Sequence, residues 1–260
     1  MHHLSLLLVI LHLILSSAVH AAEPRCPTAD KAIATDRPDV TNSSIVVPVG
    51  SFQNENGIDI TSHRSERMLD GTNSRLRLGI APCLEILVDV PTYFATLRGD
   101  APSGFSNVAP AVKWQISPVP GDFDLSITFG AGLPTGDREI NGPGVQPYLQ
   151  FPWSKKLVAG WGISGMFTLF SRPSDPISRL TTETTFVVEK EITDNLQIFT
   201  EYVGDFPDHG RSRQLMNSGV AWQFTKTQQL DLHFAFGLNS NSPDLIFGLG
   251  YSFRLDGLFR

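Results

Sequence analysis

Charged side chains recur at every second position within several apolar stretches of this chain. Arg75 and Arg77 alternate with leucines, and Lys113 lies between two apolar residues. Successive side chains of a β-strand point to opposite faces, so these charges share one face and the apolar residues share the other. The same parity holds for Glu85, Asp89, Asp124, Glu183, Glu189, Asp231 and Arg254. Such a face can form ion pairs and can select solutes by charge.

Two interpretations of this segregation are open. In a transmembrane barrel the charges would face the lumen, because Arg or Lys facing lipid at mid-depth costs about 2–4 kcal/mol. In a soluble sheet they would be solvated on an outer face. In the barrel, Glu183 and Glu201 could pair with Arg75 or Lys113 across the lumen and hold its shape.

The segment before the first predicted strand carries a second group of charges. Asp36, Arg37 and Asp39 lie close together, and Pro38 restricts the backbone at Arg37 to an extended or turn geometry. This segment could enter the lumen and constrict it, which would select small solutes by size and sign. It could instead cap the periplasmic end of the barrel.

Cys26 and Cys83 are the two cysteines of the chain. An exported chain meets an oxidising compartment, and the strand order below puts both residues on one side of the membrane. We therefore expect a disulfide between them, which would pin the Arg37 segment to the barrel. Arg25 precedes Cys26, which argues against lipidation of that cysteine.

Catalytic, cofactor and metal sites are not indicated. The cysteines and histidines are not clustered with metal-ligand spacing, and Gly136 is not part of a phosphate-binding Gly-Lys-Ser pattern. A lipid-face hydrolase would need a Ser–His pair pointing outward, but His233 has inward parity. We expect no enzyme activity and no cofactor.

The elements that would position these charges are strands. Leu245, Phe247, Leu249, Tyr251 and Phe253 alternate with small or polar residues, and the pattern recurs along the chain. It predicts about twelve strands in a single antiparallel transmembrane β-barrel, an all-β fold. The predicted strands are 51–61, 74–80, 84–90, 107–116, 123–133, 145–151, 157–170, 179–189, 196–204, 215–224, 229–238 and 244–254.

The connections between these strands alternate in predicted length. Longer loops are expected at 62–73, 91–106, 134–144, 171–178, 205–214 and 239–243. Short turns are expected at 81–83, 117–122, 152–156, 190–195 and 225–228. Bacterial outer-membrane barrels have short periplasmic turns and longer outer loops, so the N-terminus is expected in the periplasm.

The beginning of the chain indicates export. An apolar run at 4–15 is followed by small residues up to Ala21, as in a cleaved signal peptide, although an uncleaved anchor is the alternative. The expected organisation is a signal peptide at 1–21, a periplasmic or lumen-entering segment at 22–50, and an outer-membrane barrel at 51–260. The formal net charge of -6 argues against a nucleic-acid partner.

Several short motifs occur in a characteristic order. They are Thr35-Asp36-Arg37-Pro38-Asp39 with Thr41 and Ser43, Val47-Pro48-Val49-Gly50 with Phe52, Gln53 and Glu55, Arg75-Leu76-Arg77-Leu78-Gly79-Ile80, Leu84-Glu85-Ile86, Lys113, Leu133-Pro134-Thr135-Gly136-Asp137 and Phe199-Thr200-Glu201. Over essentially the whole mature chain they resemble the outer-membrane β-barrel transporters known as meta-pathway of phenol degradation proteins. The resemblance implies a twelve-stranded type of barrel in the bacterial outer membrane and passage of aromatic compounds. The chain departs from the pattern at Asn56-Gly57, and it ends on Arg260 rather than on a terminal aromatic residue.

The expected function is passive passage of small solutes, aromatic ones among them, past lumen charges at Arg37, Arg75, Arg77, Lys113, Glu183, Glu201 and Asp231. Membrane lipid, a small solute and the outer-membrane assembly machinery are the expected partners. A structural or adhesive barrel with a filled lumen and functional outer loops is the first alternative. A soluble secreted β-sandwich or lipid-binding barrel is the second.

Overall fold

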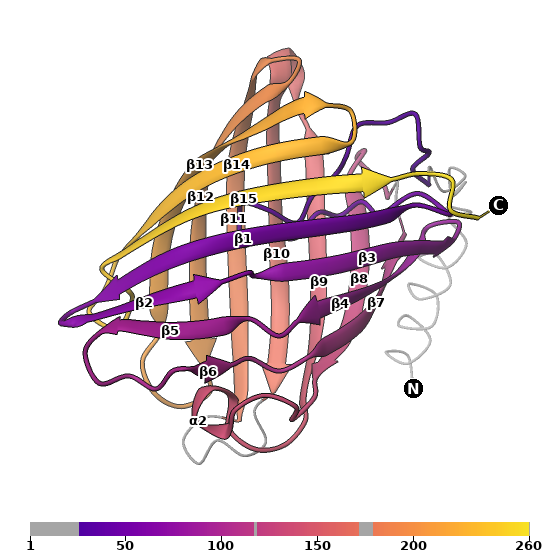
Figure 1. Cartoon of the computed structure of the whole chain (residues 1–260). Helices are drawn as coiled ribbons and strands as arrows, with labels where there is room; N and C mark the ends of the chain where they lie inside the picture. The colour runs from indigo at the N-terminus through magenta and orange to yellow at the C-terminus, as the bar shows by residue number, and fades with distance from the viewer. Residues whose placement is uncertain (1–25, 117–118, 172–178, 260) are drawn as a thin grey trace, which may run out of the picture.

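The computed structural model describes residues 26–116, 119–171 and 179–259, and these form one antiparallel sheet that closes on itself. The closing strands are β1 (Phe52–His63) and β15 (Leu245–Leu255), which pair from Phe52–Leu255 to Ser62–Leu245 (Figure 1). The other strands are β2 (Glu66–Gly71), β3 (Ser74–Ala81), β4 (Leu84–Val90), β5 (Tyr93–Arg98), β6 (Gly104–Phe105), β7 (Ala109–Gln115), β8 (Asp124–Gly132), β9 (Gln146–Lys156), β10 (Trp161–Ser171), β11 (Leu180–Thr193), β12 (Leu196–Pro207), β13 (Arg213–Thr225) and β14 (Gln228–Gly237).

Three crossings of the barrel wall are interrupted, which is why fifteen described strands make twelve crossings. The segments β2 and β3 both pair with β1, while β4 pairs with β3 and β5 pairs with β2. Similarly, β7 pairs with β4 and β6 pairs with β5. This arrangement confirms the prediction of a single antiparallel barrel of about twelve strands.

The interruptions have local causes. Between β2 and β3, Thr72 adopts a φ of 61°, which no strand residue shares. Between β4 and β5 stands Pro91, which has no backbone N–H to donate to a neighbouring strand. At each interruption the outward-facing residues change from even to odd positions or the reverse. The alternation before the interruption therefore does not predict which residues of the next segment face outward.

Several predicted connections are therefore wrong. The predicted loop 62–73 contains the end of β1 and all of β2, and the predicted loop 91–106 contains β5 and β6. The predicted turn 152–156 is part of β9, although Pro152 breaks the ladder to β8 between the pairs Leu125–Trp153 and Thr128–Gln150. The predicted contrast between long and short connections is correspondingly smaller. The signal peptide at 1–21, and residues 172–178 of the predicted loop 171–178, lie outside the described residues.

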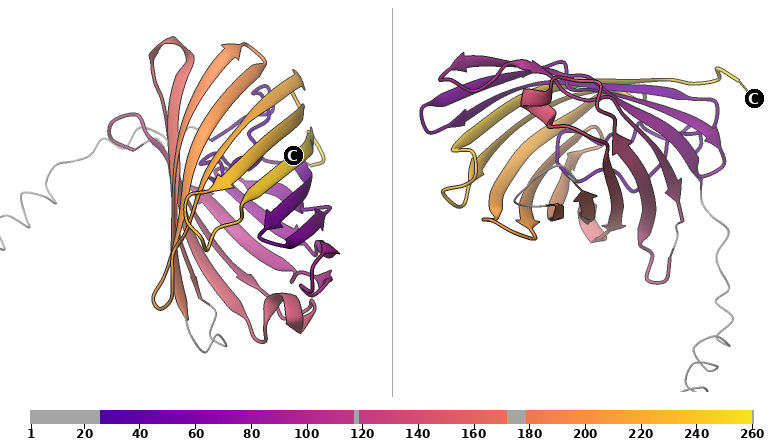
Figure 2. Two further views of the ribbon diagram at one scale, coloured as in Figure 1. Left: turned by 90° about the vertical axis from the view of Figure 1, so that its left-hand side faces the viewer. Right: turned by 90° about the horizontal axis from the view of Figure 1, so that it is seen from below.

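Both ends of the described chain lie at one end of the barrel, which we call the proximal end (Figures 1 and 2). There, Ile33 N–H donates to the carbonyl of Lys226 and Leu258 N–H donates to that of Gly50. The proximal end also carries the turn between β3 and β4 and the short helix η1 (Val158–Gly160). The opposite, distal end carries the helix α2 (Arg138–Asn141). No helix among the described residues is long and apolar enough to cross a membrane.

The two faces of the wall are the reverse of those of a soluble protein. Large apolar side chains point outward, and Phe129 is 65 % exposed and Trp114 55 %. Polar and charged side chains point inward, and Arg77, Lys113 and Glu201 are at most 1 % exposed. An apolar outer face around a polar interior is the pattern of a transmembrane barrel.

If the outer face meets lipid, an outward charge in the middle of a strand must block assembly. Leu232 lies midway along β14 and Phe247 lies near it on β15. Leu232→Arg and Phe247→Arg should each cost about 2–4 kcal/mol at mid-depth. We expect both variants to fail to appear as a heat-modifiable, membrane-inserted species on cold SDS gels.

The matched control is Leu238→Arg, because Leu238 is also outward and exposed but follows the last residue of β14. At the membrane interface the same charge costs about 0–1 kcal/mol, so this variant should insert normally. Normal insertion of the Leu232 and Phe247 variants would contradict a lipid-facing parity.

Candidate functional site in the barrel lumen

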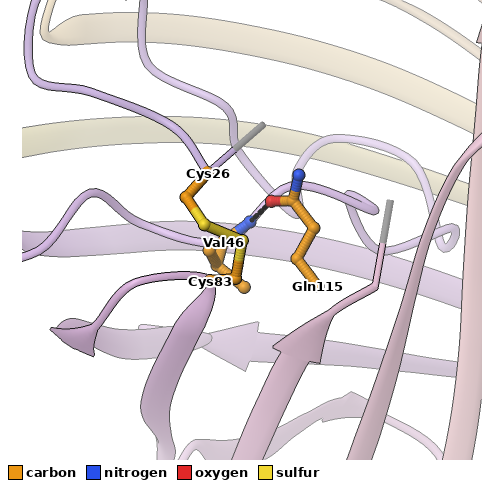
Figure 3. Close-up of a disulfide and its surroundings, with 4 residues drawn as sticks. All are labelled: Cys26, Val46, Cys83 and Gln115. Carbon is orange, nitrogen blue, oxygen red and sulfur yellow. Dashed lines mark hydrogen bonds between the residues drawn. A yellow bond between two sulfur atoms is a disulfide. The ribbon is translucent and has the colours of Figure 1, made fainter. Parts of the chain in front are cut away.

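Residues 26–50, which we call the plug, run through the lumen before the chain enters β1. Figure 2 shows this indigo segment inside the ring of strands. Its first residue, Cys26, forms a disulfide with Cys83 in the turn between β3 and β4 (Figure 3). Beside it, Val46 N–H donates to Gln115 Oε1 over 3.1 Å. The plug is therefore fixed covalently at both ends, by the disulfide and by its continuation into β1.

Asp36 of the plug lies among three cations of the wall. Its carboxylate is 2.9 Å from Arg75 Nη1, 3.1 Å from Lys113 Nζ and 3.3 Å from Arg77 Nη1. Burial opposes ionisation of this group, but the charges of Arg77, Lys113 and Arg75 outweigh it and hold the pKa of Asp36 below its usual value. Asp36 therefore carries a negative charge that the three cations share.

Wall carboxylates complete this network. Arg77 lies 2.9 Å from Glu55 and 3.0 Å from Glu85. Glu85 Oε2 also accepts the backbone N–H of Val47 over 2.6 Å, and Glu55 Oε2 accepts that of Asp36 over 2.8 Å. The same carboxylates thus neutralise wall cations and satisfy plug backbone donors, which would otherwise be buried without partners.

Glu201 anchors the plug on the opposite wall. Its carboxylate accepts the backbone N–H groups of Val40 and Thr41 over 2.9 and 2.8 Å, and it also accepts Asn217 Nδ2 over 3.0 Å. The hydroxyl of Thr41 bonds both Glu201 and the hydroxyl of Thr185 on β11. Glu201 therefore binds plug backbone rather than Arg75 or Lys113, which were its expected partners.

Arg37 lies flat against the seam where the barrel closes. Its Nη2 is 3.3 Å from Asp231 Oδ1. Gly57 of β1 and Gly250 of β15 are directly paired beneath it. A Cβ at Gly57 would lie 2.2 Å from Arg37 Nη1, and one at Gly250 would lie 2.4 Å from Nε. Only glycine at these two positions leaves room for the guanidinium.

Arg254 binds the first residues of the plug at the proximal end. Its guanidinium donates to the carbonyls of Ala29 and Lys31 over 3.0 and 2.9 Å and pairs with Asp256 at 2.7 Å. Asp256 in turn accepts the hydroxyl of Ser51 over 2.7 Å. The residues after Phe253 thus extend the last strand and bind the plug.

Of the candidate residues from the sequence, Arg37 is part of the plug, and the structure brings Arg75, Arg77, Lys113, Glu201 and Asp231 of the wall against it. Glu183 lies elsewhere, on β11 opposite Asp205. The sequence reasoning did not select the amides Gln115, Gln150 and Gln229, which also bond the plug. Each of these glutamines has the inward parity of its strand, and this feature of the sequence could have identified them.

Two of the cavities that border the plug share part of their lining. One of about 390 Å³ reaches toward β2 and β5 and is the distal chamber. Another of about 250 Å³ reaches toward the ends of β9 and β11 and is the proximal chamber. Arg37, Pro38, Asp39 and Asn42 line both, so this stretch is the partition between them. Within the described residues no group of three or more His, Cys, Asp or Glu is placed to hold a metal ion.

Comparisons with known proteins agree with this architecture. A family model described as "Putative MetA-pathway of phenol degradation" matches residues 35–255. An outer-membrane channel from Pseudomonas putida F1 is similar in structure with a TM-score of 0.62 at 13 % identity, over 89 % of this chain and 100 % of that one.

Two porins are similar to a lesser degree. NanC porin has a TM-score of 0.55 at 11 % identity over 78 % of this chain and 100 % of that one. KdgM porin has a TM-score of 0.54 at 6 % identity, over 77 % of this chain and 98 % of that one. At these identities the likeness is one of fold. Comparison with curated protein sequences found no match.

The charge on Asp36 should decide whether the plug stays docked. Asp36→Asn leaves the buried Arg77 and Lys113 and the partly exposed Arg75 short of a counter-charge, and breaking a buried ion-pair network costs about 3–5 kcal/mol. We expect proteinase K to cut the plug of this variant in the folded barrel and to spare that of the parent chain. Asp30→Asn is the control, because Asp30 is exposed and pairs with exposed Lys31. Equal protection of the Asp36 variant would contradict the role of this carboxylate.

The disulfide should be visible in the isolated protein. Unfolded chain with Cys26 joined to Cys83 should run faster on a non-reducing gel than after reduction, because the loop between these cysteines, which lie 57 positions apart, stays closed. The Cys26→Ser variant should show no such difference. Labelling of both thiols in unreduced, denatured protein would rule the linkage out.

Proposed function

This chain belongs to the family described as "Putative MetA-pathway of phenol degradation", as its motifs indicated, and we propose that it is a passive channel for small solutes in the bacterial outer membrane. The observation that carries the proposal is the division of the lumen. Cavities of about 390 and 250 Å³ reach the plug from opposite ends. Both are lined by Arg37, Pro38, Asp39 and Asn42. A small solute that moved between these two cavities would have to pass this stretch of the plug.

The faces of the wall support the membrane location. The apolar outer surface would contact lipid, and a polar interior would contact water and solute. The proximal end would face the periplasm, because most of the short turns and both ends of the described chain lie there. The segment 1–21 would serve as a cleaved export signal, and the outer-membrane assembly machinery would insert the barrel.

The solutes would be small and aromatic. The description of the family names phenol degradation, and phenol is a small aromatic compound. No cofactor or energy source is required in this mechanism, because the solute would diffuse down its gradient. Arg37 and Asp231 would act at the partition, while Arg75, Arg77, Lys113 and Glu201 would hold the plug in place. Glu183 would contribute charge to the lumen wall away from the plug.

A second candidate is a structural barrel with a filled lumen. The density of plug contacts favours it, since hydrogen bonds reach the plug from β1, β3, β4, β7, β9, β12, β14 and β15. In that case the distal connections would carry the function. The two candidates differ in whether the intact protein conducts.

Single-channel recording in a planar bilayer separates them. The parent chain should give small discrete steps, and a variant lacking residues 27–46 should give steps several-fold larger, because the partition is gone. Heat-modifiability on gels verifies that both are folded. If the parent chain inserts without steps and only the shortened variant conducts, the barrel is closed at rest and the channel proposal fails.

A further inference from the structure

The cations at the two ends of the barrel differ in kind. At the distal end of the described chain they are all arginines, namely Arg64, Arg67, Arg98, Arg138, Arg179, Arg211 and Arg213. At the proximal end, apart from Arg254, which binds the plug, they are all lysines, namely Lys31, Lys155, Lys156, Lys190 and Lys226. Arginine presents a planar fork of donors that matches the oxygens of a phosphate, whereas lysine presents a point charge. The distal end is therefore the one suited to bind phosphate groups.

Three of the distal arginines gather where β1 ends, β2 begins and β5 ends (Figure 1). Arg67 pairs directly with Arg98 across β2 and β5, because a shift of register at this point passes over Leu97. Arg64 lies in the turn between β1 and β2. All three are exposed, and we call them the rim triad. Like charges directly opposite each other on neighbouring strands destabilise a sheet, so an anion bound between Arg67 and Arg98 would stabilise this one.

The described chain supplies no carboxylate to the guanidinium groups of the rim triad. Arg64 Nη2 donates to the carbonyl of Ser240 over 3.3 Å, and Arg67 Nε donates to Ser62 Oγ over 3.3 Å. Asp244 accepts the backbone N–H of Arg64 rather than its side chain. The arginines that form ion pairs in the described residues are Arg37, Arg75, Arg77, Arg213 and Arg254. The charges of the rim triad are therefore available to an external anion.

Apolar side chains lie next to the rim triad on the same outward face. Along β1 and β2, the outward pair Ser62–Arg67 is followed toward the middle of the barrel by the outward pair Ile60–Leu69. Two residues of a strand span about 7 Å, so the charges stand one outward position beyond the apolar surface. On β5, Leu97 is 53 % exposed and extends that surface. A molecule that carries phosphate groups close to acyl chains would match both levels.

From these observations we propose that the rim triad binds a phosphate of lipopolysaccharide, the phosphorylated glycolipid of the outer leaflet of the bacterial outer membrane. A phosphate of its lipid A part would lie between Arg67 and Arg98, and the acyl chains would lie against Ile60, Leu69 and Leu97. A free phosphate ion would contact the charges and leave the apolar surface unused. The inference rests on the proposed function for its orientation, because it requires the distal end to reach the outer leaflet.

The test is native mass spectrometry of the full-length protein in detergent, with bisphosphorylated lipid A added. The parent chain should retain one lipid A, and the double variant Arg67→Gln, Arg98→Gln should retain at least about fivefold less, because its two phosphate donors are gone. Heat-modifiability on gels verifies that each variant is folded.

The matched control is the double variant Lys155→Gln, Lys190→Gln. It removes the same charge from the proximal end, where the two lysines lie over the rings of Phe123 and Trp161. We expect this variant to retain as much lipid A as the parent chain. Equal losses in the two double variants would overturn the proposal, because they would show an effect of net charge alone.

Two other lipids distinguish the phosphate of lipid A from simpler causes of retention. Dephosphorylated lipid A has the acyl chains alone, and phosphatidylglycerol is an anionic lipid with one phosphate. If the parent chain retained either of them as well as it retains bisphosphorylated lipid A, the proposal would fail. It would fail also if the parent chain were a dimer that the arginine variant converts to a monomer, since the face would then bind a second copy.

Retention of lipid A is measured independently of conduction. Conductance steps without retention would leave the channel standing and remove the lipid site. Retention without steps would keep the lipid site and remove the channel.

Discussion

The structure depends on the neutralisation of three cations in an enclosed lumen. Arg75, Arg77 and Lys113 point inward because the outward parity is apolar, and Arg77 and Lys113 are shielded from bulk water while Arg75 is partly exposed. A buried cation requires a counter-charge and hydrogen-bond partners. The wall supplies Glu55, Glu85 and Asp89, and the plug supplies Asp36 at the point where all three cations meet. Wall and plug therefore satisfy each other, and neither arrangement is complete alone.

The same reciprocity explains how an irregular segment can occupy the lumen. Plug backbone N–H groups need acceptors, and inward side chains of Glu55, Glu85, Glu201 and Gln115 provide them. These side chains accept hydrogen bonds from the plug backbone, as the backbone carbonyls of neighbouring strands do for the wall. Because the disulfide and β1 fix both plug ends at the proximal side, the segment stays tethered to that end of the barrel. A solute path would pass beside the partition or move it locally.

The sequence predicted the barrel, its strand number and the inward set of charges, because period-two alternation carries all three. It failed at β2, β5 and β6, where Thr72 and Pro91 interrupt the alternation. It also could not predict which charges meet across the lumen. That depends on strand tilt and register, which place Glu201 beside Thr41 and Glu183 opposite Asp205. The location of the plug was open for the same reason, since its contacts come from eight or more strands that are distant in sequence.

The plug lies inside the barrel against β11, where Thr41 contacts Thr185. Oxidative cross-linking tests it directly. The side-chain oxygens of Thr41 and Thr185 are in contact, so the double variant Thr41→Cys, Thr185→Cys should form a disulfide in intact membranes. Mass spectrometry should recover the joined peptides together with the Cys26–Cys83 pair. Recovery of the native pair without any link between positions 41 and 185 would place the plug outside the lumen and contradict the account.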